Sequence, residues 1–240
     1  MAIKDLNKIV VIGCGGIGSQ LSVVLMRYLN SVKDLGQIKK IVLVDGDKLE
    51  RKNLSRQEFK EKHIADNKAQ ALSEFYSDKY KELDISFIDK YIDNININGI
   101  ITDNSVVFLG VDNNKTRNLV NTYCLGLKNV LLLSGGNDLT DGNIQVVLKV
   151  DGMLKTKSME ENHKDILEPT DKLPSEMSCQ ELFDNGTPQV IFANVFASTL
   201  MLNAFWQVLN NGIIDYSEVW FDIKSNRARP VNLENKAIEI

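Results

Sequence analysis

The stretch from Ile9 to Arg56 constrains the fold of this chain more than any other. It opens with an apolar run at Ile9–Ile12, passes through a glycine-rich segment and an amphipathic helical segment, and reaches a second apolar run at Ile41–Val44, which ends in Asp45. Strand, glycine turn, helix, strand and acidic end follow one another in the order of a nucleotide-binding βαβ unit. The sequence therefore predicts an α/β protein with a Rossmann-like, mainly parallel sheet and helices on both faces.

The glycine segment assigns each of its residues a task. Gly13 permits the tight turn, Gly15 and Gly16 let the backbone approach phosphates, and Gly18 lets the helix pack closely on its strand. The helix that follows points its N–H groups and positive dipole end at an anion. Asp45, at the tip of the second strand, is placed to accept hydrogen bonds from ribose hydroxyls.

The glycine pattern alone is also typical of NAD-dependent oxidoreductases, so the residues that follow decide between the two. They are Asn53-Leu54-Ser55-Arg56-Gln57, then Lys68, then Asp112-Asn113-Asn114-Lys115-Thr116-Arg117 after another apolar run. Hydride transfer requires neither an Arg-Gln pair nor a lysine there. A site that handles three phosphates and a metal ion requires such groups.

This set resembles the ThiF/MoeB family and the adenylation domains of ubiquitin-activating (E1) enzymes, whose pattern is G-x-G-G-x-G-S, D-x-D, N-L-x-R-Q, a lysine and D-N-x-x-x-R. The resemblance covers residues 8 to about 150. It implies an E1-like enzyme that uses ATP and Mg²⁺ to adenylate the C-terminal carboxylate of a ubiquitin-like or sulfur-carrier protein.

The resemblance also implies roles for the polar residues of the N-L-x-R-Q motif and the lysine. Arg56 suits a forked phosphate contact and Lys68 a point-charge contact. Asn53 and Gln57 are expected to fix phosphate oxygens or the attacking carboxylate. The spacing from Arg56 to Lys68 is one residue shorter than in the family pattern.

Three further residues belong to the expected metal end of the site. Asp112 follows a strand and matches the family's magnesium-binding aspartate, although it could also cap the helix that starts near Asn114. Arg117, one turn into that helix, is expected to brace Asp112. Asp47 is expected to orient Arg56 or to lie near the metal.

The second half of the chain carries a further resemblance, to the ThiF-family protein of the PRTRC system, a gene cassette that also encodes a ubiquitin-like protein. It rests on Ser178-Cys179-Gln180, Leu182-Phe183-x-Asn185 and a terminal hairpin with Arg229-Pro230. Activating enzymes that form a thioester keep a cysteine in this region. Cys179 is thus a candidate nucleophile, and a half-buried structural cysteine at a helix start is the alternative.

Two features depart from the relatives. Residues 1–7 contain no arginine, whereas many relatives reach across a dimer with an N-terminal arginine. Cys14, Cys124 and Cys179 form no C-x-x-C pair, so no structural zinc is predicted and a reducing, cytoplasmic setting is expected. Cys14 requires no chemistry, and Cys124 is expected in the core.

The chain is predicted to form a single domain, with a nucleotide-binding core over 8–150, a polar mobile loop over 151–186, and a helix and terminal hairpin over 187–240. The helix over 188–211, with Thr187 as its N-cap and Gly212 as its C-cap, is apolar on all sides and should be buried; Asn194, Asn203 and Gln207 argue against a membrane span. Its apolar surplus predicts a homodimer.

Composition and the two histidines complete the expectations. A net charge of −4 without a basic cluster gives no reason to expect nucleic acid. His63 and His163 lie in charged stretches and are expected to be solvated. The alternatives left open are adenylation of a small carboxylate or peptide end, an inactive nucleotide-binding scaffold of the same family, and an NAD-dependent oxidoreductase.

Overall fold

A computed structural model of the 240-residue chain describes residues 6–32, 38, 40–55, 57–173, 190–211, 213–233 and 238–239. Its strands are β1 (Lys8–Ile12), β2 (Lys40–Val44), β3 (Asp84–Ile88), β4 (Ser105–Leu109), β5 (Val130–Asn137), β6 (Asp141–Val150), β7 (Met153–Leu154), β8 (Ile213–Ile214), β9 (Tyr216–Asp222), β10 (Arg227–Asn232) and β11 (Ile238–Glu239). Its α-helices are α1 (Gly16–Ser31), α2 (Lys68–Lys79), α3 (Ile97–Ile100), α4 (Asn114–Gly126), α5 (Met159–Asn162), α6 (Lys164–Leu167) and α8 (Ile191–Trp206), with a π-helical turn at Gln207–Asn211 and 3₁₀ turns at Arg51–Ser55 and Glu61–His63.

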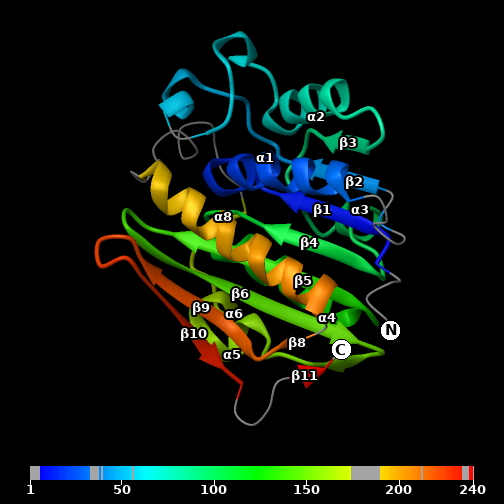
Figure 1. Cartoon of the computed structure of the whole chain (residues 1–240), viewed down its shortest axis with the longest axis vertical. Helices are drawn as coiled ribbons and strands as arrows, with labels where there is room; N and C mark the ends of the chain where they lie inside the picture. Colours follow the sequence, from blue (N-terminus) through cyan, green and yellow to red (C-terminus); the bar gives the residue numbers. More distant parts are fainter. Residues whose placement is uncertain are drawn as a thin grey trace.

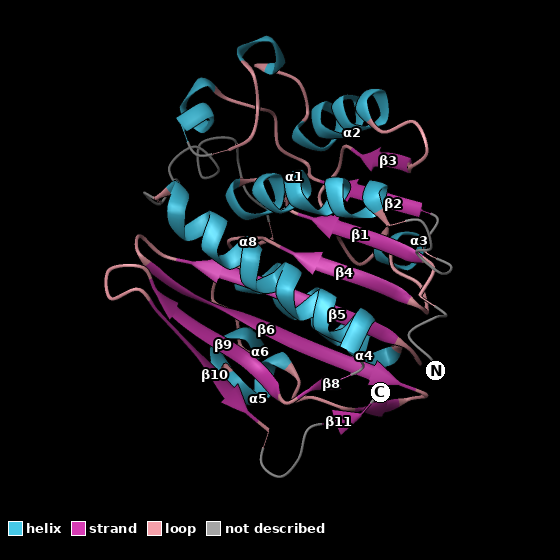
Figure 2. Ribbon diagram, viewed as in Figure 1, coloured by secondary structure: helices cyan, strands magenta, loops and turns pink. Residues whose placement is uncertain are grey.

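A nine-stranded sheet forms the centre of the molecule (Figures 1 and 2). Its main path runs β10-β9-β6-β5-β4-β1-β2-β3, and β7 pairs with β6. The strands from β3 to β5 are parallel, and β6, β9 and β10 add to them antiparallel. The predicted fold class is confirmed, including the antiparallel β6 and the closing hairpin.

Helices cover both faces of the sheet, because each central strand carries apolar side chains on both sides. On one face α1 and α8 lie side by side over the strands, as Figure 1 shows, and α2 continues this layer over β3. Their core includes Leu21 and Leu25 of α1 and Met201 and Phe205 of α8. The opposite face is covered by α3 to α6. Strands buried on both faces are typical of parallel α/β sheets.

The helix α8 differs from the prediction in two ways. It begins at Ile191, after Val190, whereas the expected caps Thr187 and Gly212 lie outside the described residues. It is also not buried all round, since Phe192, Val195 and Trp206 are exposed. The helix is long and apolar enough to span a membrane, but here one side packs on β5, β6 and α1 as in a soluble core.

The predicted polar loop after β6 also differs from the structure. Its first part forms β7, α5 and α6, and it is anchored by the buried side chains of Met159 and Ile166. Ser158 and Glu161 form a capping box at the start of α5. Helices of one turn bury too few side chains to show a period in the sequence. Residues 174–189, with Cys179, lie outside the described residues.

Candidate nucleotide site and adjoining cavity

A cavity of about 1010 Å³ opens at the carboxyl ends of the parallel strands. Open α/β sheets bind ligands there, at the point where the strand order changes direction, which in this sheet is between β1 and β4. The predicted site residues that line it are Gly13, Gly15, Gly16, Asp45, Asp47, Asn53, Gln57, Lys68 and Asp112. Gly18 lies behind the loop, and Arg56 and Cys179 are outside the described residues. Residues far apart in the sequence thus converge on one cavity.

The glycine loop has the geometry expected from its sequence. Gly13 has a φ of +85°, and a Cβ there would lie 2.8 Å from the carbonyl oxygen of Gly110. A Cβ on Gly18 would lie 1.8 Å from the carbonyl oxygen of Gly13, so α1 can pack this closely on the glycine loop only if residue 18 is a glycine. α1 starts at Gly16 with no side-chain cap and no acidic residue in its first turn. Its N-terminus therefore faces the cavity without a negative charge of its own.

Asp45 connects the tip of β2 to the glycine loop. Its Oδ2 accepts a hydrogen bond of 2.6 Å from the backbone N–H of Cys14, and its Oδ1 accepts one of 2.7 Å from that of Asp47. Burial raises the pKa of Asp45 to about 6, although the charge of Lys68 and the two N–H groups oppose the rise. Asp45 thus fixes the loop as well as facing the cavity.

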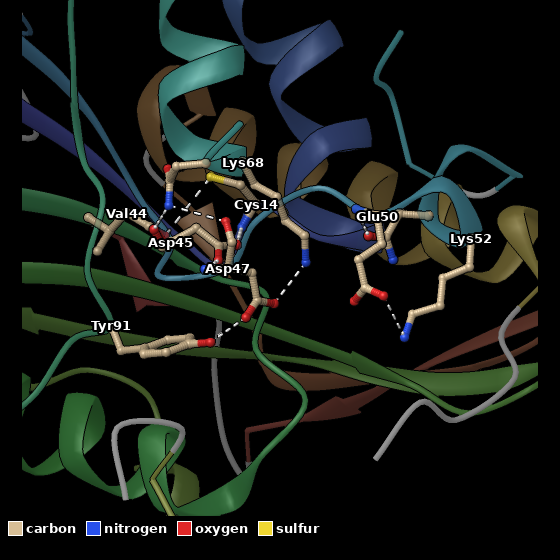
Figure 3. A network of polar contacts seen from close by, with 10 residues as sticks. Cys14, Val44, Asp45, Asp47, Glu50, Lys52, Lys68 and Tyr91 are labelled. Atoms are coloured by element: carbon tan, nitrogen blue, oxygen red, sulfur yellow. Dashed lines mark hydrogen bonds and ion pairs between the residues drawn. The ribbon is translucent and has the colours of Figure 1, made fainter. Parts of the chain in front are cut away.

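Lys68 reaches from the start of α2 toward the two aspartates (Figure 3). Its Nζ is 2.8 Å from Oδ2 of Asp47, whose other oxygen accepts a hydrogen bond from the hydroxyl of Tyr91. Burial disfavours the ammonium, but the charges of Asp45 and Asp47 outweigh it and raise the pKa of Lys68. The sequence did not single out Tyr91, nor Asn67, which caps α2 and donates to the carbonyls of Asp45 and Asp47.

The two amides of the N-L-x-R-Q motif are both buried but differ in their partners. The Oδ1 of Asn53 accepts a hydrogen bond of 2.9 Å from the N–H of Glu50, so Asn53 also stabilises its own turn. The Oε1 of Gln57 is buried and finds no hydrogen-bond partner among the described residues. The Oε1 of Gln57 is therefore able to accept a hydrogen bond from a bound group.

Two contacts considered for the start of α4 are not the ones that the structure shows. The cap of α4 is Asn113, whose side chain accepts from the N–H of Thr116, and not Asp112. Asp112 is exposed, and its carboxylate makes no hydrogen bond or ion pair with another described residue. Arg117 is buried and donates to the carbonyls of Val111 and Gly135 and to Ser134 rather than to Asp112. Its buried guanidinium, which has only donors, thus connects the backbone after β4 to that of β5 at the cavity.

His163 corrects a prediction, because it is not solvated. Only 18% of its side chain is exposed, and its Nε2 lies 2.5 Å from Oε1 of the buried Glu218. That hydrogen bond raises the pKa of His163 above its ordinary value. The ring lines the same cavity and lies 5.6 Å from the ring of Trp220. The charged stretch around His163 in the sequence gave no signal of this pairing.

Several polar atoms buried at the cavity have no hydrogen-bond partner within the described ranges. They are Oε1 of Gln57, Oγ1 of Thr116, Oδ1 of Asn137 and both amide atoms of Gln145. Most buried polar groups in native proteins are paired. Such a concentration at one cavity is expected where a ligand rich in hydrogen-bonding groups binds. Acidic side chains also outnumber basic ones among the described residues of the lining.

The fold and this site define the class of the protein as a nucleotide-binding α/β protein of the doubly wound kind. More specifically, the chain belongs to the ThiF family, whose sequence pattern matches residues 2–231. The SAMP-activating enzyme E1 of Haloferax volcanii is 28% identical over 119 residues, which are 49% of this chain and 41% of that protein.

Solved structures share the fold. MccB of E. coli in a structure with ATP superposes with a TM-score of 0.69 at 20% identity over 98% of this chain and 65% of that one. PaaA gives a TM-score of 0.67 at 12% identity, over 96% of this chain and 65% of that one. The chain thus spans less than two thirds of the length of each of these relatives. The predicted E1-like family is confirmed.

Proposed function

We propose that this chain binds ATP with Mg²⁺ and adenylates the C-terminal carboxylate of a polypeptide partner. The observation that carries this proposal is the convergence of an uncapped helix N-terminus, a buried aspartate at the tip of β2, a lysine and an exposed aspartate on one cavity. Membership of an E1-like family supports it.

The nucleotide has matching partners along the cavity. The N-terminus of α1 offers N–H groups and a positive dipole end to a phosphate. Asp45 has lone pairs beyond those used by Cys14 and Asp47, since a carboxylate can accept about four hydrogen bonds. These are placed for ribose hydroxyls. Lys68 then adds a positive charge beside the phosphates, and Arg56 is proposed to add a second.

The donor set fits a magnesium ion that is shared with the phosphates. Mg²⁺ usually takes one or two carboxylates and completes its shell with water and phosphate oxygens. Asp112 is the residue proposed to hold it, because its carboxylate is exposed and unengaged within the described part of the chain. When bound, the ion supplies positive charge that offsets the charge of the phosphates in this acidic cavity.

The proposed reaction forms one bond and breaks one. An oxygen of the substrate carboxylate attacks the α-phosphorus of ATP, the bond to the bridging oxygen of the β-phosphate breaks, and pyrophosphate leaves. The chain's own contribution is to hold both anions close together and to stabilise the charge that develops on the phosphates, through Lys68, Arg56 and the N–H groups of α1. No proton has to be removed from the carboxylate at neutral pH.

The partner is proposed to be a small ubiquitin-like or sulfur-carrier protein with a glycine-rich tail, as the resemblance to the PRTRC cassette implies. The relative from Haloferax is named for activating SAMP, and MccB has been solved with MccA. The cavity volume lies at the upper end of the range of about 300–1,000 Å³ for small-ligand sites, which leaves room for a tail beside a nucleotide.

A thioester on Cys179 is proposed as a second step. The thiolate would attack the acyl carbon of the adenylate and AMP would leave. Mixing enzyme, ATP, Mg²⁺ and partner should then give a covalent adduct that is lost with reductant. If the adduct forms unchanged in Cys179→Ala, Cys179 does not carry it. If no adduct forms in an enzyme that adenylates well, Cys179 is structural and the reaction ends at the adenylate.

A homodimer is proposed from the exposed apolar side chains of α8. Phe192, Val195 and Trp206 are 69%, 40% and 43% exposed. Apolar side chains that are exposed together on one side of a helix are typical of an interaction surface. A two-fold interface would bury this side of α8 in both copies of the chain.

Pyrophosphate–ATP exchange with and without candidate ubiquitin-like proteins tests the main proposal. Exchange should depend on the partner and fall at least 100-fold in Asp112→Asn, whose melting temperature should be unchanged because the side chain is exposed. Asp84→Asn, at the opposite end of the strands, is the matched control. ATP binding without exchange would indicate a scaffold, and NADH binding without exchange an oxidoreductase.

A further inference from the structure

A lane of polar and aromatic side chains crosses three neighbouring strands on the face covered by α4, α5 and α6. In the register of the sheet, Gln145 of β6 pairs with Ser134 of β5 and with Glu218 of β9, and Asn143 pairs with Trp220. Paired residues project to the same face. Farther along β6, the same face is apolar and packs in the core. The polar lane therefore begins where the cavity begins.

One end of the lane is held rigid by its own contacts. The Nε2 of His163 and the Nδ2 of Asn143 both donate to Oε1 of Glu218, each at 2.5 Å. The His163 ring, so fixed, lies at 39° to the Trp220 ring with 5.6 Å between centroids. Trp220 nevertheless stays 47% exposed. A large aromatic surface is thus fixed in place and left open.

Gln145 is the member of the lane whose side chain lacks hydrogen-bond partners among the described residues. Its side chain is 3% exposed, yet neither Oε1 nor Nε2 has a hydrogen-bond partner in the described part of the chain. Its neighbours in register do have hydrogen-bond partners: Ser134 accepts from Arg117 at 3.1 Å, and Glu218 accepts from His163. A buried donor and a buried acceptor that stay unpaired are each destabilising. A ligand that offers an acceptor and a donor together would satisfy both, and a peptide group does so.

A second, smaller cavity extends the lane away from the nucleotide end. It measures about 450 Å³, lies at the β9–β10 hairpin, and shares Asp141 and Trp220 with the main cavity. The two cavities adjoin at these residues, and the main cavity continues past Gln145 to the N-termini of α1 and α4. Two adjoining cavities leave room for more than a small carboxylic acid.

We propose that Gln145 and Trp220 form a subsite for the peptide segment that precedes the substrate's terminal carboxylate. Gln145 pairs with one peptide group of that segment, and Trp220 packs against the adjoining residue. His163 and Glu218 are positioning residues that hold Trp220. The inference rests on the proposed function, since it assumes that the carboxylate is delivered to the nucleotide end of the same cavity.

Fluorescence of Trp220 tests the subsite directly. The chain has two tryptophans, so Trp206→Phe leaves Trp220 as the sole reporter. The probes are tryptophan-free random-sequence peptides with free carboxyl termini, as a dipeptide pool and a hexapeptide pool, in the presence of ATP and Mg²⁺. The hexapeptides should change the emission with a saturable midpoint, and the dipeptides should not. No change with hexapeptides, or the same midpoint for both pools, overturns the proposal.

Gln145→Leu separates binding from stability. Removing two unpaired buried atoms should leave the melting temperature equal or higher, while the hexapeptide midpoint rises about tenfold or more and the ATP midpoint does not move. Gln70→Leu on α2 is the control. An unchanged hexapeptide midpoint in Gln145→Leu refutes the role of Gln145. If that variant fails to fold, Trp220→Leu, at a half-exposed position, measured by calorimetry, must show the same loss.

The positioning role of His163 has its own readout. His163→Gln should raise the hexapeptide midpoint about three- to tenfold and shift the emission maximum of free Trp220, with the ATP midpoint unchanged. The failure of this inference is distinguishable from that of the proposed function. Peptide binding without pyrophosphate exchange would refute adenylation but not the subsite. Exchange that small carboxylates support as well as hexapeptides do would refute the subsite but not adenylation.

Discussion

Replacing Lys68 by methionine tests the electrostatics of the site most directly. The side chain of Lys68 is 8% exposed, and its Nζ lies 2.8 Å from Asp47 and faces the buried Asp45. Methionine keeps most of the length and apolar volume of the lysine stem and removes the charge. Two carboxylates then remain close together without the buried positive charge of Lys68.

The expected loss of stability follows from the contact. Coulomb attraction across 2.8 Å is about 6 kcal/mol at an effective dielectric constant of about 20. Asp47 keeps 44% of its side chain exposed, so solvent screens much of that energy. Breaking a buried ion pair by removing one partner costs roughly 3–5 kcal/mol. We therefore expect Lys68→Met to lower the free energy of unfolding by about 3 kcal/mol at pH 8.

The loss should depend on pH because of Asp45. Its pKa is raised from 3.8 to about 6 by burial, so the folded protein binds a proton there more readily than the unfolded chain. That contribution to stability is fully present below the ordinary pKa and is lost as pH rises through about 6; it corresponds to about 3 kcal/mol. The charge of Lys68 opposes the rise, so its removal raises the pKa of Asp45 further and enlarges the penalty at pH 8 relative to pH 5.

Urea unfolding at pH 5 and pH 8 measures both effects. The destabilisation by Lys68→Met should be larger at pH 8 by at least about 1 kcal/mol. Lys81→Met is the matched control, because Lys81 also lies 2.8 Å from an aspartate but 70% of its side chain is exposed; no measurable loss is expected there. Equal losses for Lys68→Met at the two pH values would refute the reasoning about Asp45.

Three further outcomes are expected from the same structure. Gly18→Ala should prevent soluble expression or lower the melting temperature by more than 10 °C in calorimetry, because its Cβ would lie 1.8 Å from a backbone oxygen. Asp171→Ala should lower the free energy of unfolding by about 1 kcal/mol in urea titrations, because Asp171 accepts the N–H groups of Asn114 and Lys115 at the start of α4. Phe192→Lys should give a monomer in light scattering at a concentration where the unaltered chain is a dimer; a monomer for both contradicts the proposed interface.

The part of the site that the sequence predicted lies at the ends of consecutive parallel strands. Asp45 follows β2, Asp112 follows β4, and the glycine loop follows β1. Parallel strands joined by right-handed crossovers put their carboxyl ends on one edge, so order along the chain is enough to bring these groups together. Lys68 could be placed for a related reason, because it begins the helix of the next crossover.

The partners of these residues were harder to predict. The expectation that Asp47 orients Arg56 or lies near the metal stays a prediction, because Arg56 is outside the described residues, whereas the contacts of Asp47 with Lys68 and Tyr91 were not predicted. Arg117 was expected at Asp112, and it donates to the backbone of β5. Motif spacing fixes where a residue lies along an element. Which of several nearby acceptors it contacts depends on burial and on distances of a few ångströms, which spacing does not encode.

The exposed side of α8 shows a limit of composition as a guide to burial. A helix with apolar residues on all faces was predicted to be enclosed, yet the sheet and α1 cover one side only. Composition reports that apolar surface must be covered, but it does not say by what. The sequence therefore cannot distinguish a core helix from one that meets a second copy of the chain.

His163 marks the point where reasoning along the chain fails and three-dimensional register takes over. Its partner Glu218 is 55 residues away, and the contact exists only because α5 and α6 lie over β6 and β9. Gln145 and Glu218 look like ordinary strand residues, since alternation on a half-covered sheet would put them in solvent. The antiparallel register of β6 with β9 puts both under the short helices instead. Polar residues that a local pattern assigns to the surface but the fold buries are the ones that point to a ligand, and here they lead to the lane beside Trp220.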